Sequence, residues 1–288
     1  MAKQKKPQSV KRNRIIDAVW SNALLIVLAL IWIIPIVWVV LASFSTQKGY
    51  ISSTFFPTEY TINNYVRLFT ETNFLKWVGN TILIALFNTV LTTLFTVLAA
   101  YALSRFRFKL RKFYLNITLI LGMFPGFMAM VAVFLIFSLL HLINNIWALL
   151  VYYVAGAGLG FFVCKGYFDT IPKDIDEAVR MDGASHLKAF IRVYFPLVTP
   201  IIIYTALLAF MAPWADYILA GILLKDTQKT VVETVAVGLY EWTDTSKINT
   251  HFTLFAAGST LVAIPITILY ISLQRFFVEG ISSGAVKG

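Results

Sequence analysis

Few side chains of this sequence could take part in covalent chemistry or bind a metal ion. The three histidines, His141, His186 and His251, lie far apart along the chain, and Cys164 is the lone cysteine. A histidine-based metal or nucleophile site requires such groups to converge, and a lone cysteine forms neither an intrachain disulfide nor a metal cluster. No phosphate-binding loop of the form G-x-x-x-x-G-K-[ST] occurs. We therefore expect no catalytic residue, no metal site and no bound cofactor in this chain.

One carboxylate stands inside an apolar segment and is a candidate for a role in transport. Asp216 is the only charged residue between positions 193 and 224, and Trp214 and Tyr217 lie beside it. Carboxylates inside a membrane are costly and usually face a polar interior. We therefore predict that Trp214, Asp216 and Tyr217 border a translocation pathway. Two alternatives stay open: Asp216 is a structurally bonded residue near the outer interface, or it carries a proton in an ion-coupled transporter.

A second candidate for the pathway is the pair Pro125-Gly126, which interrupts an apolar run. A Pro-Gly pair breaks the helical hydrogen-bond ladder, and such breaks in membrane helices tend to face a cavity or neighbouring protein. Pro125 and Gly126 are therefore included in the predicted pathway. A simple kink in a helix is the alternative interpretation.

The most charged stretch, residues 170–200, has the pattern of two short helices joined by a glycine. Pro172 suits the start of a helix, because its missing N–H would have no partner there. Gly183 is suited to end that helix in the left-handed conformation, and Ser185 can cap a second helix. The first turns carry three carboxylates, which complement the helix dipole: Asp174, Asp176 and Glu177.

Helical spacing predicts that each of these short helices buries one apolar face. The first face comprises Ile171, Ile175, Ala178 and Val179, and the second Leu187, Phe190, Ile191 and Tyr194. On periodicity alone, the pair is equally well explained as an amphipathic hairpin that rests at a membrane interface.

The elements that position these residues are expected to be transmembrane helices. The 288 residues are 59% hydrophobic and only 13% charged, whereas soluble domains average about 25% charged residues. A membrane span needs roughly 20 apolar residues, and one uncharged run, 113–164, is long enough for two spans with a turn at 141–145. We predict an all-α polytopic membrane protein with six transmembrane helices. The other runs are 18–47, 77–104, 193–224 (which includes Asp216) and 248–274.

The distribution of Lys and Arg predicts the orientation of these spans. Of the 24 Lys and Arg residues, 18 fall on the side that holds both termini and residues 170–192. The side richer in Lys and Arg is cytoplasmic in most membrane proteins, so both termini are predicted to be cytoplasmic. Because the cations are scattered over short loops, nucleic-acid binding is a poor explanation of the net charge of +10. The first apolar run is too long for a cleaved signal peptide.

The charged stretch resembles the EAA loop of ABC importer permeases. Glu177-Ala178-Val179, three residues, Gly183, nine residues and then 193–196, ending in Pro196, follow the family pattern Glu-Ala-Ala, three, Gly, nine, Ile-x-Leu-Pro. Val179, Val193 and Phe195 depart from the pattern, each replacing one apolar residue by another. In this family the loop is a coupling helix that docks into a cleft of a cytoplasmic ATPase subunit. The resemblance thus implies that Glu177, Ala178, Gly183 and Pro196 couple the chain to an ATPase.

Further stretches resemble permeases of the maltose/maltodextrin type over nearly the whole chain. Trp214 to Tyr217 is similar to a Trp-Asn-Glu-Phe element, with Ala215 and Asp216 as departures, and residues 274–288 are similar to a tail that tucks between two ATPase subunits. The outer loop 225–251 matches a loop that reaches a solute-binding protein. The resemblance places at its exposed tip Leu239, Tyr240, Glu241 and Trp242.

The resemblance implies a role in a bacterial plasma-membrane complex that imports sugars, most specifically maltodextrins or related oligosaccharides. Its expected partners are a second homologous permease, two ATPase subunits that hold ATP and Mg²⁺, an extracytoplasmic sugar-binding protein and the lipid bilayer. The expected organisation is a basic segment 1–20, a transmembrane domain 21–277 with the coupling loop 170–196, and a tail 278–288. An ion-coupled carrier that uses Asp216, and a membrane scaffold without solute flux, are the alternatives.

Overall fold

The computed structural model describes residues 7–47, 49, 55–224 and 232–285. Within these ranges the regular structure is helical, apart from an isolated bridge between Ser45 and Tyr60. Three helices are each long and apolar enough to cross a membrane alone. They are α1 (Pro7–Ser43), α3 (Phe74–Arg105) and α14 (Ile248–Ala285).

Three further spans are bent helix pairs. The helices α4 (Arg111–Gly122) and α5 (Gly126–Leu139) meet at 102°, and α6 (Ile146–Gly160) and α7 (Phe162–Thr170) meet at 40°. The segment His186–Leu197 meets α11 (Thr199–Ala215) at 82°. Counting each pair as one span gives six, so the prediction of an all-α chain with six spans is confirmed at the level of length and composition.

The turn predicted inside the long uncharged run is present. His141 and Asn144 have positive φ angles of 54° and 60°, which reverse the chain between α5 and α6. The side chain of Asn145 then accepts a hydrogen bond from the N–H of Trp147 and caps α6.

The helix α11, the longer part of the fifth span, begins later and ends earlier than the apolar run 193–224 predicts. Pro196 and Pro200 lack N–H donors, so the helix breaks at Val198 before α11 starts at Thr199. At its other end α11 stops at Ala215, and Asp216 links it to the short helix α12 (Ile218–Leu223). Asp216 therefore lies at a helix junction rather than inside a span.

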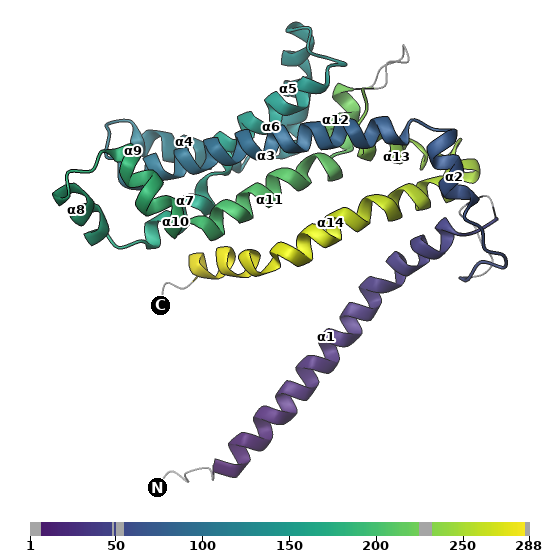
Figure 1. The fold of residues 1–288 in the computed structure, drawn as a ribbon, viewed down its shortest axis with the longest axis horizontal. Helices are drawn as coiled ribbons and strands as arrows, with labels where there is room; N and C mark the ends of the chain where they lie inside the picture. The colour runs from purple at the N-terminus through teal and green to yellow at the C-terminus, as the bar shows by residue number, and fades with distance from the viewer. Residues whose placement is uncertain (1–6, 48, 50–54, 225–231, 286–288) are drawn as a thin grey trace.

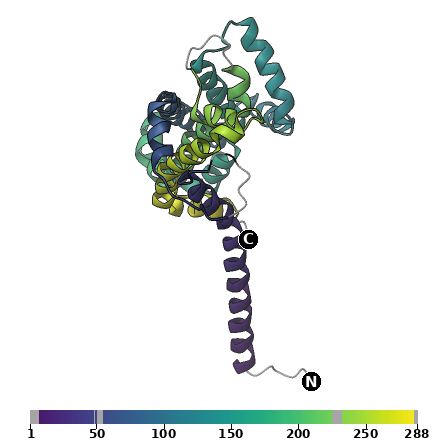
Figure 2. The same cartoon turned by 90° about the vertical axis from the view of Figure 1, so that its right-hand side faces the viewer.

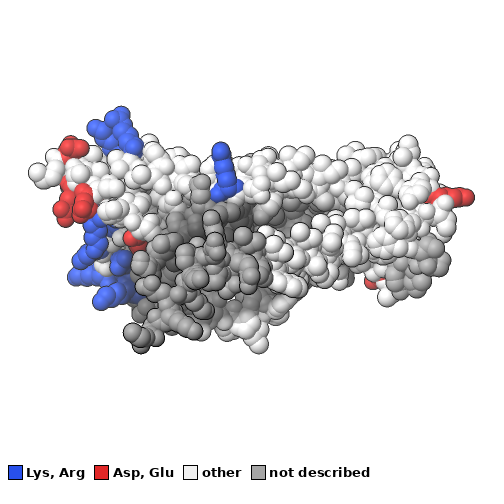
Figure 3. Space-filling view, turned by 90° about the horizontal axis from the view of Figure 1, so that it is seen from below, with Lys and Arg blue, Asp and Glu red and all other residues white. Residues whose placement is uncertain are grey.

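The short helices gather at the two ends of the long axis (Figure 1). One end carries α2 (Asn63–Thr70), α12 and α13 (Val235–Glu241). The opposite end carries α8 (Asp174–Met181), α9 (His186–Ala189), the π-helical turn η1 (Phe190–Tyr194) and α10 (Phe195–Leu197). In the view from below, most of the visible Lys and Arg side chains lie at this second end (Figure 3). The charge asymmetry of the sequence thus corresponds to a spatial separation.

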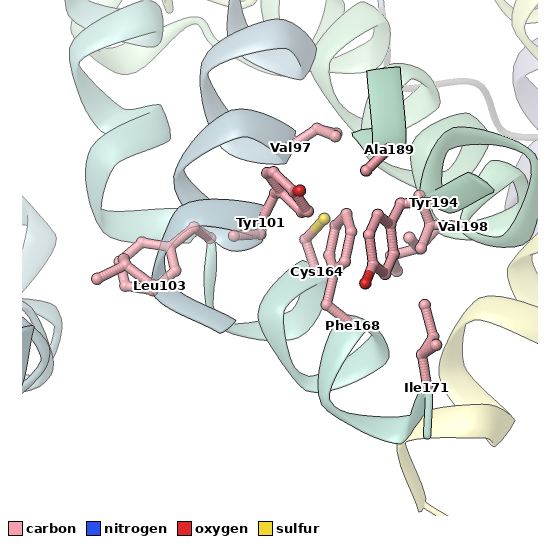
Figure 4. Packing of buried hydrophobic residues seen from close by; sticks show 12 residues of the cluster. Val97, Tyr101, Leu103, Cys164, Phe168, Ile171, Ala189, Tyr194 and Val198 are labelled. Carbon is pink, nitrogen blue, oxygen red and sulfur yellow. The ribbon is translucent and has the colours of Figure 1, made fainter. Parts of the chain in front are cut away.

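The helix α3 organises the body of the molecule. Its Asn88 donates a hydrogen bond to the carbonyl of Ala209 in α11 at 2.7 Å, and Thr81 accepts one from the N–H of Val235 at 2.8 Å. Polar side chains that bond across helices stabilise packing where lipid supplies no hydrophobic force. The C-terminal part of α3 contributes Val97, Tyr101 and Leu103 to a buried cluster with α7, η1 and α11 (Figure 4).

The helix α1 diverges from this body and is exposed along most of its described length (Figures 1 and 2). Near its end Trp38 packs against Phe252 of α14, with ring centroids 5.3 Å apart. Its C-terminus is held by the buried Asn64, whose side-chain amide donates to the carbonyls of Ser43 and Ser45. An apolar helix exposed in this way requires lipid or another protein around it.

Candidate coupling site

The helix α8 is the centre of the predicted coupling site, and its ends form as the sequence predicts. It begins two residues after Pro172 and carries three carboxylates in its first turn. Gly183 follows it with φ of +66°, and a Cβ built there would meet no atom within 4 Å. The Ser185 hydroxyl accepts a hydrogen bond from the N–H of Lys188 and caps α9. Gly183 is therefore needed for its backbone conformation rather than for space.

The exposed face of α8 includes two of the predicted coupling residues. Glu177 and Ala178 are exposed, whereas Ile175 and Val179 face the buried cluster. Ala178 was predicted to lie on the buried face, and this is wrong: at this position the helix turns its small side chain outward. An exposed carboxylate beside an exposed alanine leaves a shallow surface that another chain can approach closely.

The predicted apolar face of the second short helix is also partly wrong. Leu187 and Ile191 are exposed, at 67% and 56%, while Ala189 and Tyr194 are buried. Part of the cause is a π-helical turn, in which the N–H of Phe195 bonds to the carbonyl of Phe190, five residues earlier. This turn begins after Leu187, so it accounts for the departures from Phe190 onward and not for Leu187. A π turn adds a residue to the helical repeat and rotates the following side chains relative to α-helical spacing.

Pro196 accounts for the position of this turn. Proline has no N–H and its ring collides with the carbonyl four residues before it, which disfavours a regular α-helix there. Pro196 lies in α10, directly after η1 and two residues before the break at Val198. Pro196 therefore shapes the joint between the coupling loop 170–196 and α11. It is exposed rather than packed in the core.

A buried arginine that the sequence did not single out ties this site together. Arg105, the last residue of α3, forms an ion pair with Asp176 of α8 at 3.0 Å. Its guanidinium also donates to the carbonyls of Phe168 and Ile171, and lies 5.2 Å from the centre of the Tyr194 ring. In the sequence Arg105 is one of several cations in a short basic loop, so no local signal separates it from its neighbours.

Asp216 is bonded to two neighbouring elements. One carboxylate oxygen accepts from the Tyr153 hydroxyl of α6 at 2.8 Å, and the other accepts from the N–H of Leu219 at 3.0 Å. Trp214 is half-buried in a cluster with α3 and α14, and Tyr217 stacks on Tyr240 with ring centroids 4.3 Å apart. Three of the predicted pathway residues, Trp214, Asp216 and Tyr217, thus lie around the junction of α11 and α12.

The pair Pro125-Gly126 forms the 102° corner between α4 and α5. Both residues are exposed, and the neighbouring Phe124 and Phe127 are 60% and 68% exposed. The predicted break is therefore real, but within this chain it lies on the surface and lines no cavity with Asp216.

Two of the four residues at the predicted tip of the outer loop are part of the core. Leu239 and Trp242 are only 7% and 6% exposed, because α13 packs against α3 and α14. Trp242 lies 5.2 Å from the Trp77 ring of α3. Tyr240 is 53% exposed, and Glu241 pairs with Lys247 at 3.2 Å. The expectation that all four residues are exposed is wrong, and Tyr240 and Glu241 alone face outward.

Comparison with known proteins places this chain in a transport family. Residues 93–283 match the family described as "Binding-protein-dependent transport system inner membrane component". The chain is 38% identical to the maltodextrin transport system permease protein MalD of Streptococcus pneumoniae, over 97% of this chain and 99% of that protein. It is 34% identical to the galactooligosaccharides transport system permease protein GanQ of Bacillus subtilis, with the same two coverages.

A solved structure has the same fold. A chain of a bacterial ABC transporter involved in the import of the acidic polysaccharide alginate is 26% identical and superposes with a TM-score of 0.76. The match covers 95% of this chain and 99% of that one. With its helical spans and the family match over residues 93–283, this chain belongs to the inner-membrane components of binding-protein-dependent ABC transport systems.

Proposed function

We propose that this chain is one of two membrane subunits of an ATP-driven importer for oligosaccharides, most specifically maltodextrins. The similar permeases MalD and GanQ are named for maltodextrin and galactooligosaccharides, and the alginate transporter is named for another polymer of sugars. The proposed complex adds a second homologous permease, two cytoplasmic ATPase subunits that bind ATP and Mg²⁺, and an extracytoplasmic sugar-binding protein.

The observation that carries this proposal is the exposed face of α8. Glu177 and Ala178 project from a short helix at the cation-rich end. Gly183 sets the angle between this helix and the segment that follows it. In the proposed mechanism, an ATPase subunit binds this face and moves it when ATP closes the ATPase dimer. The joint at Pro196 passes that movement to α11, which packs along α3. The chain itself performs no covalent chemistry.

The charge distribution supports an orientation with both termini and α8 in the cytoplasm. It also supports the boundaries of a basic segment 1–20, a transmembrane domain 21–277 with the coupling loop 170–196, and a tail 278–288. Of these segments, residues 1–6, 48, 50–54, 225–231 and 286–288 lie outside the described part of the chain. On the outer side, Tyr240 and Glu241 remain the proposed contacts for the binding protein.

Uptake by the reconstituted complex tests this proposal. Vesicles that contain both permeases and the ATPase subunits should accumulate labelled maltodextrin when ATP and loaded binding protein are supplied. Omission of this chain should abolish uptake, and a proton uncoupler should leave it intact. Uptake that needs no ATPase subunit, or that stops on addition of the uncoupler, would refute it.

The ion-coupled alternative receives no support from the site around Asp216. Both carboxylate oxygens accept hydrogen bonds, one from a side chain and one from the backbone of the next helix. Such bonding is typical of a residue that joins elements, because each bond satisfies a donor that would otherwise be unpaired. The matched family likewise consists of transport components that depend on a binding protein.

A further inference from the structure

The helix α8 has almost no hydrophobic anchorage of its own. None of its residues with a described side chain is buried, and only Ile175 and Val179 make partial apolar contact with the cluster beneath it. A short helix held so weakly is not rigid, because the stability of short helices in proteins comes mainly from packing of an apolar face. Polar contacts must therefore fix its position.

Those contacts converge on Asp176. One of its carboxylate oxygens accepts from Arg105 at 3.0 Å, and the other accepts from the hydroxyl of Tyr194. Arg105 ends α3 and Tyr194 ends η1, so a single carboxylate of α8 is held by two different elements. The Arg105 side chain is only 7% exposed, and partial burial strengthens a charged hydrogen bond relative to one in water.

The second terminal nitrogen of Arg105 joins the same assembly to α7, while the buried Nε of Arg105 has no hydrogen-bond partner among the described residues. Its second terminal nitrogen donates to the carbonyl of Phe168 at 2.7 Å and to that of Ile171 at 3.1 Å. Phe168 lies in the last turn of α7 and Ile171 follows the helix. The carbonyl of Phe168 also accepts from the N–H of Ile171 at 3.2 Å, and a cation is favoured at the C-terminus of a helix. A separate contact, from Ser104 to Asp169 at 2.6 Å, already joins α3 to α7. The bond to Asp176 is thus what adds α8 to this unit.

The lower part of the buried cluster shows the same convergence. Tyr194 and Phe168 lie side by side, with Tyr101 of α3 and Cys164 of α7 next to them (Figure 4). Tyr101 packs against both rings, with centroid separations of 5.2 Å to Tyr194 and 5.8 Å to Phe168. The clamp formed by Arg105, Asp176 and Tyr194 therefore rests on a rigid aromatic base.

We propose that the Arg105–Asp176–Tyr194 clamp makes α8 move as one body with the cytoplasmic end of α3, so that force applied to α8 reaches the spans. The proposal rests on the function proposed above, and it assigns a positioning role to residues that do not themselves face the ATPase. Without the clamp, α8 still presents Glu177 to an ATPase subunit, but its motion is absorbed locally instead of being passed to α3.

The first test measures the position of α8 without any ATPase. On a Cys164→Ala background, spin labels are placed at Lys109, beyond the end of α3, and at Met181, which is 88% exposed on α8. We expect a narrow distance distribution that widens at least twofold in Arg105→Lys, because one ammonium group cannot bond to Asp176 and to both carbonyls in the geometry of a guanidinium. Tyr194→Phe, which keeps the ring and removes only the hydroxyl, should widen it as well.

The second test uses the complete complex with the same variants. Arg105→Lys and Tyr194→Phe should retain co-purification of the ATPase within about twofold and lose at least tenfold of ATP-driven uptake, since each 1.4 kcal/mol of coupling is worth a factor of ten. Arg107→Lys is the matched control, because Arg107 is exposed two residues further on. If Arg105→Lys shows the wild-type width of the distance distribution, or wild-type uptake, the proposed clamp is refuted. Loss of ATPase docking is expected instead in Glu177 variants, in which the distances between the two spin labels should stay unchanged.

Discussion

Asp216 shows how a residue chosen for its chemistry can have a structural task. Its carboxylate bonds to Tyr153 of α6 and to the start of α12, and thereby closes the junction where α11 ends. These bonds fit one alternative from the sequence, in which Asp216 is a structurally bonded residue. Its place near the outer interface stays a prediction. Its polarity should then matter more than its charge.

We predict that Asp216→Asn keeps most of the maltodextrin uptake, because an amide oxygen can still accept from Leu219 or Tyr153. Asp216→Leu should lose most of it, since two donors are left unpaired at about 1–3 kcal/mol each. Reconstituted uptake at equal amounts of inserted protein is the measurement. Equal loss in Asn and Leu variants would show that the charge itself is required.

Gly183 is a second residue whose role is decided by its backbone. With φ of +66° and free space around it, an alanine there meets no neighbour but must adopt the left-handed region. That strain costs about 1–2 kcal/mol. Asparagine tolerates this conformation better than alanine does.

Gly183→Ala should therefore weaken ATPase co-purification at limiting concentration roughly 5- to 30-fold, and Gly183→Asn should weaken it less. Gly166→Ala is the matched control, because Gly166 lies in α7 with equally open space and no positive φ. Similar behaviour of the two alanine variants would mean that the left-handed turn at Gly183 does not position α8.

At the scale of elements, local sequence patterns predicted the turns and caps, whereas the long-range contacts could not be predicted from the sequence. The sequence was sufficient to predict three local features, because each depends on a few consecutive residues. They are the left-handed turn at Gly183, the Ser185 cap and the turn near His141. The ion pair of Arg105 joins residues 71 positions apart. Nothing in local spacing distinguishes its buried guanidinium from the exposed Arg107.

The helix α13 is a second element whose long-range contacts the sequence did not predict, because the sequence indicated exposure where the structure shows packing. A mixed-charge outer loop with large aromatics indicates exposure, yet α13 folds back so that Trp242 meets Trp77 at 5.2 Å. The close approach depends on Gly238: a Cβ there would lie 2.3 Å from the Trp77 ring. The proposed contact with a binding protein is thereby reduced to the residues of α13 that face away from α3.

Gly238→Ala should consequently displace α13 and destabilise the detergent-solubilised protein, by about 1–3 kcal/mol as for other overpacked cores. Gly221→Ala in α12 should be nearly neutral, because its Cβ would meet nothing within 4 Å. Thermal unfolding followed by intrinsic fluorescence compares the two. An unchanged midpoint for Gly238→Ala would contradict the packing of α13 on α3.

At the scale of the whole molecule, the fold places two groups of short helices toward opposite ends of the long axis. The α8 end carries most of the visible cations, and α2, α12 and α13 lie at the other end of the long axis (Figures 1 and 3). The six spans and the break at Pro125-Gly126 followed from the sequence. The angles of the three bends and the divergent course of α1 did not, because they depend on contacts between helices.

This separation predicts the outcome of cysteine labelling in intact cells. On a Cys164→Ser background, cysteines at Lys109 and Lys173 should resist an impermeant reagent, whereas cysteines at Glu71 and Ser246 should react. All four positions are exposed, so access depends on the side of the membrane rather than on burial. Labelling at position 173 from outside would place α8 on the wrong side for a cytoplasmic ATPase.

The central claim is that the exposed face of α8 binds an ATPase subunit, and the most direct measurement is ATPase capture by the purified permease pair. Glu177→Lys reverses a charge on that face, which would cost about 2–5 kcal/mol if Glu177 meets a buried cation. Glu59→Lys makes the same charge change at an exposed position near the α2 end. We predict that Glu177→Lys inserts normally but captures at least tenfold less ATPase and imports no maltodextrin, while Glu59→Lys behaves as wild type. Normal capture and uptake by Glu177→Lys would contradict the account.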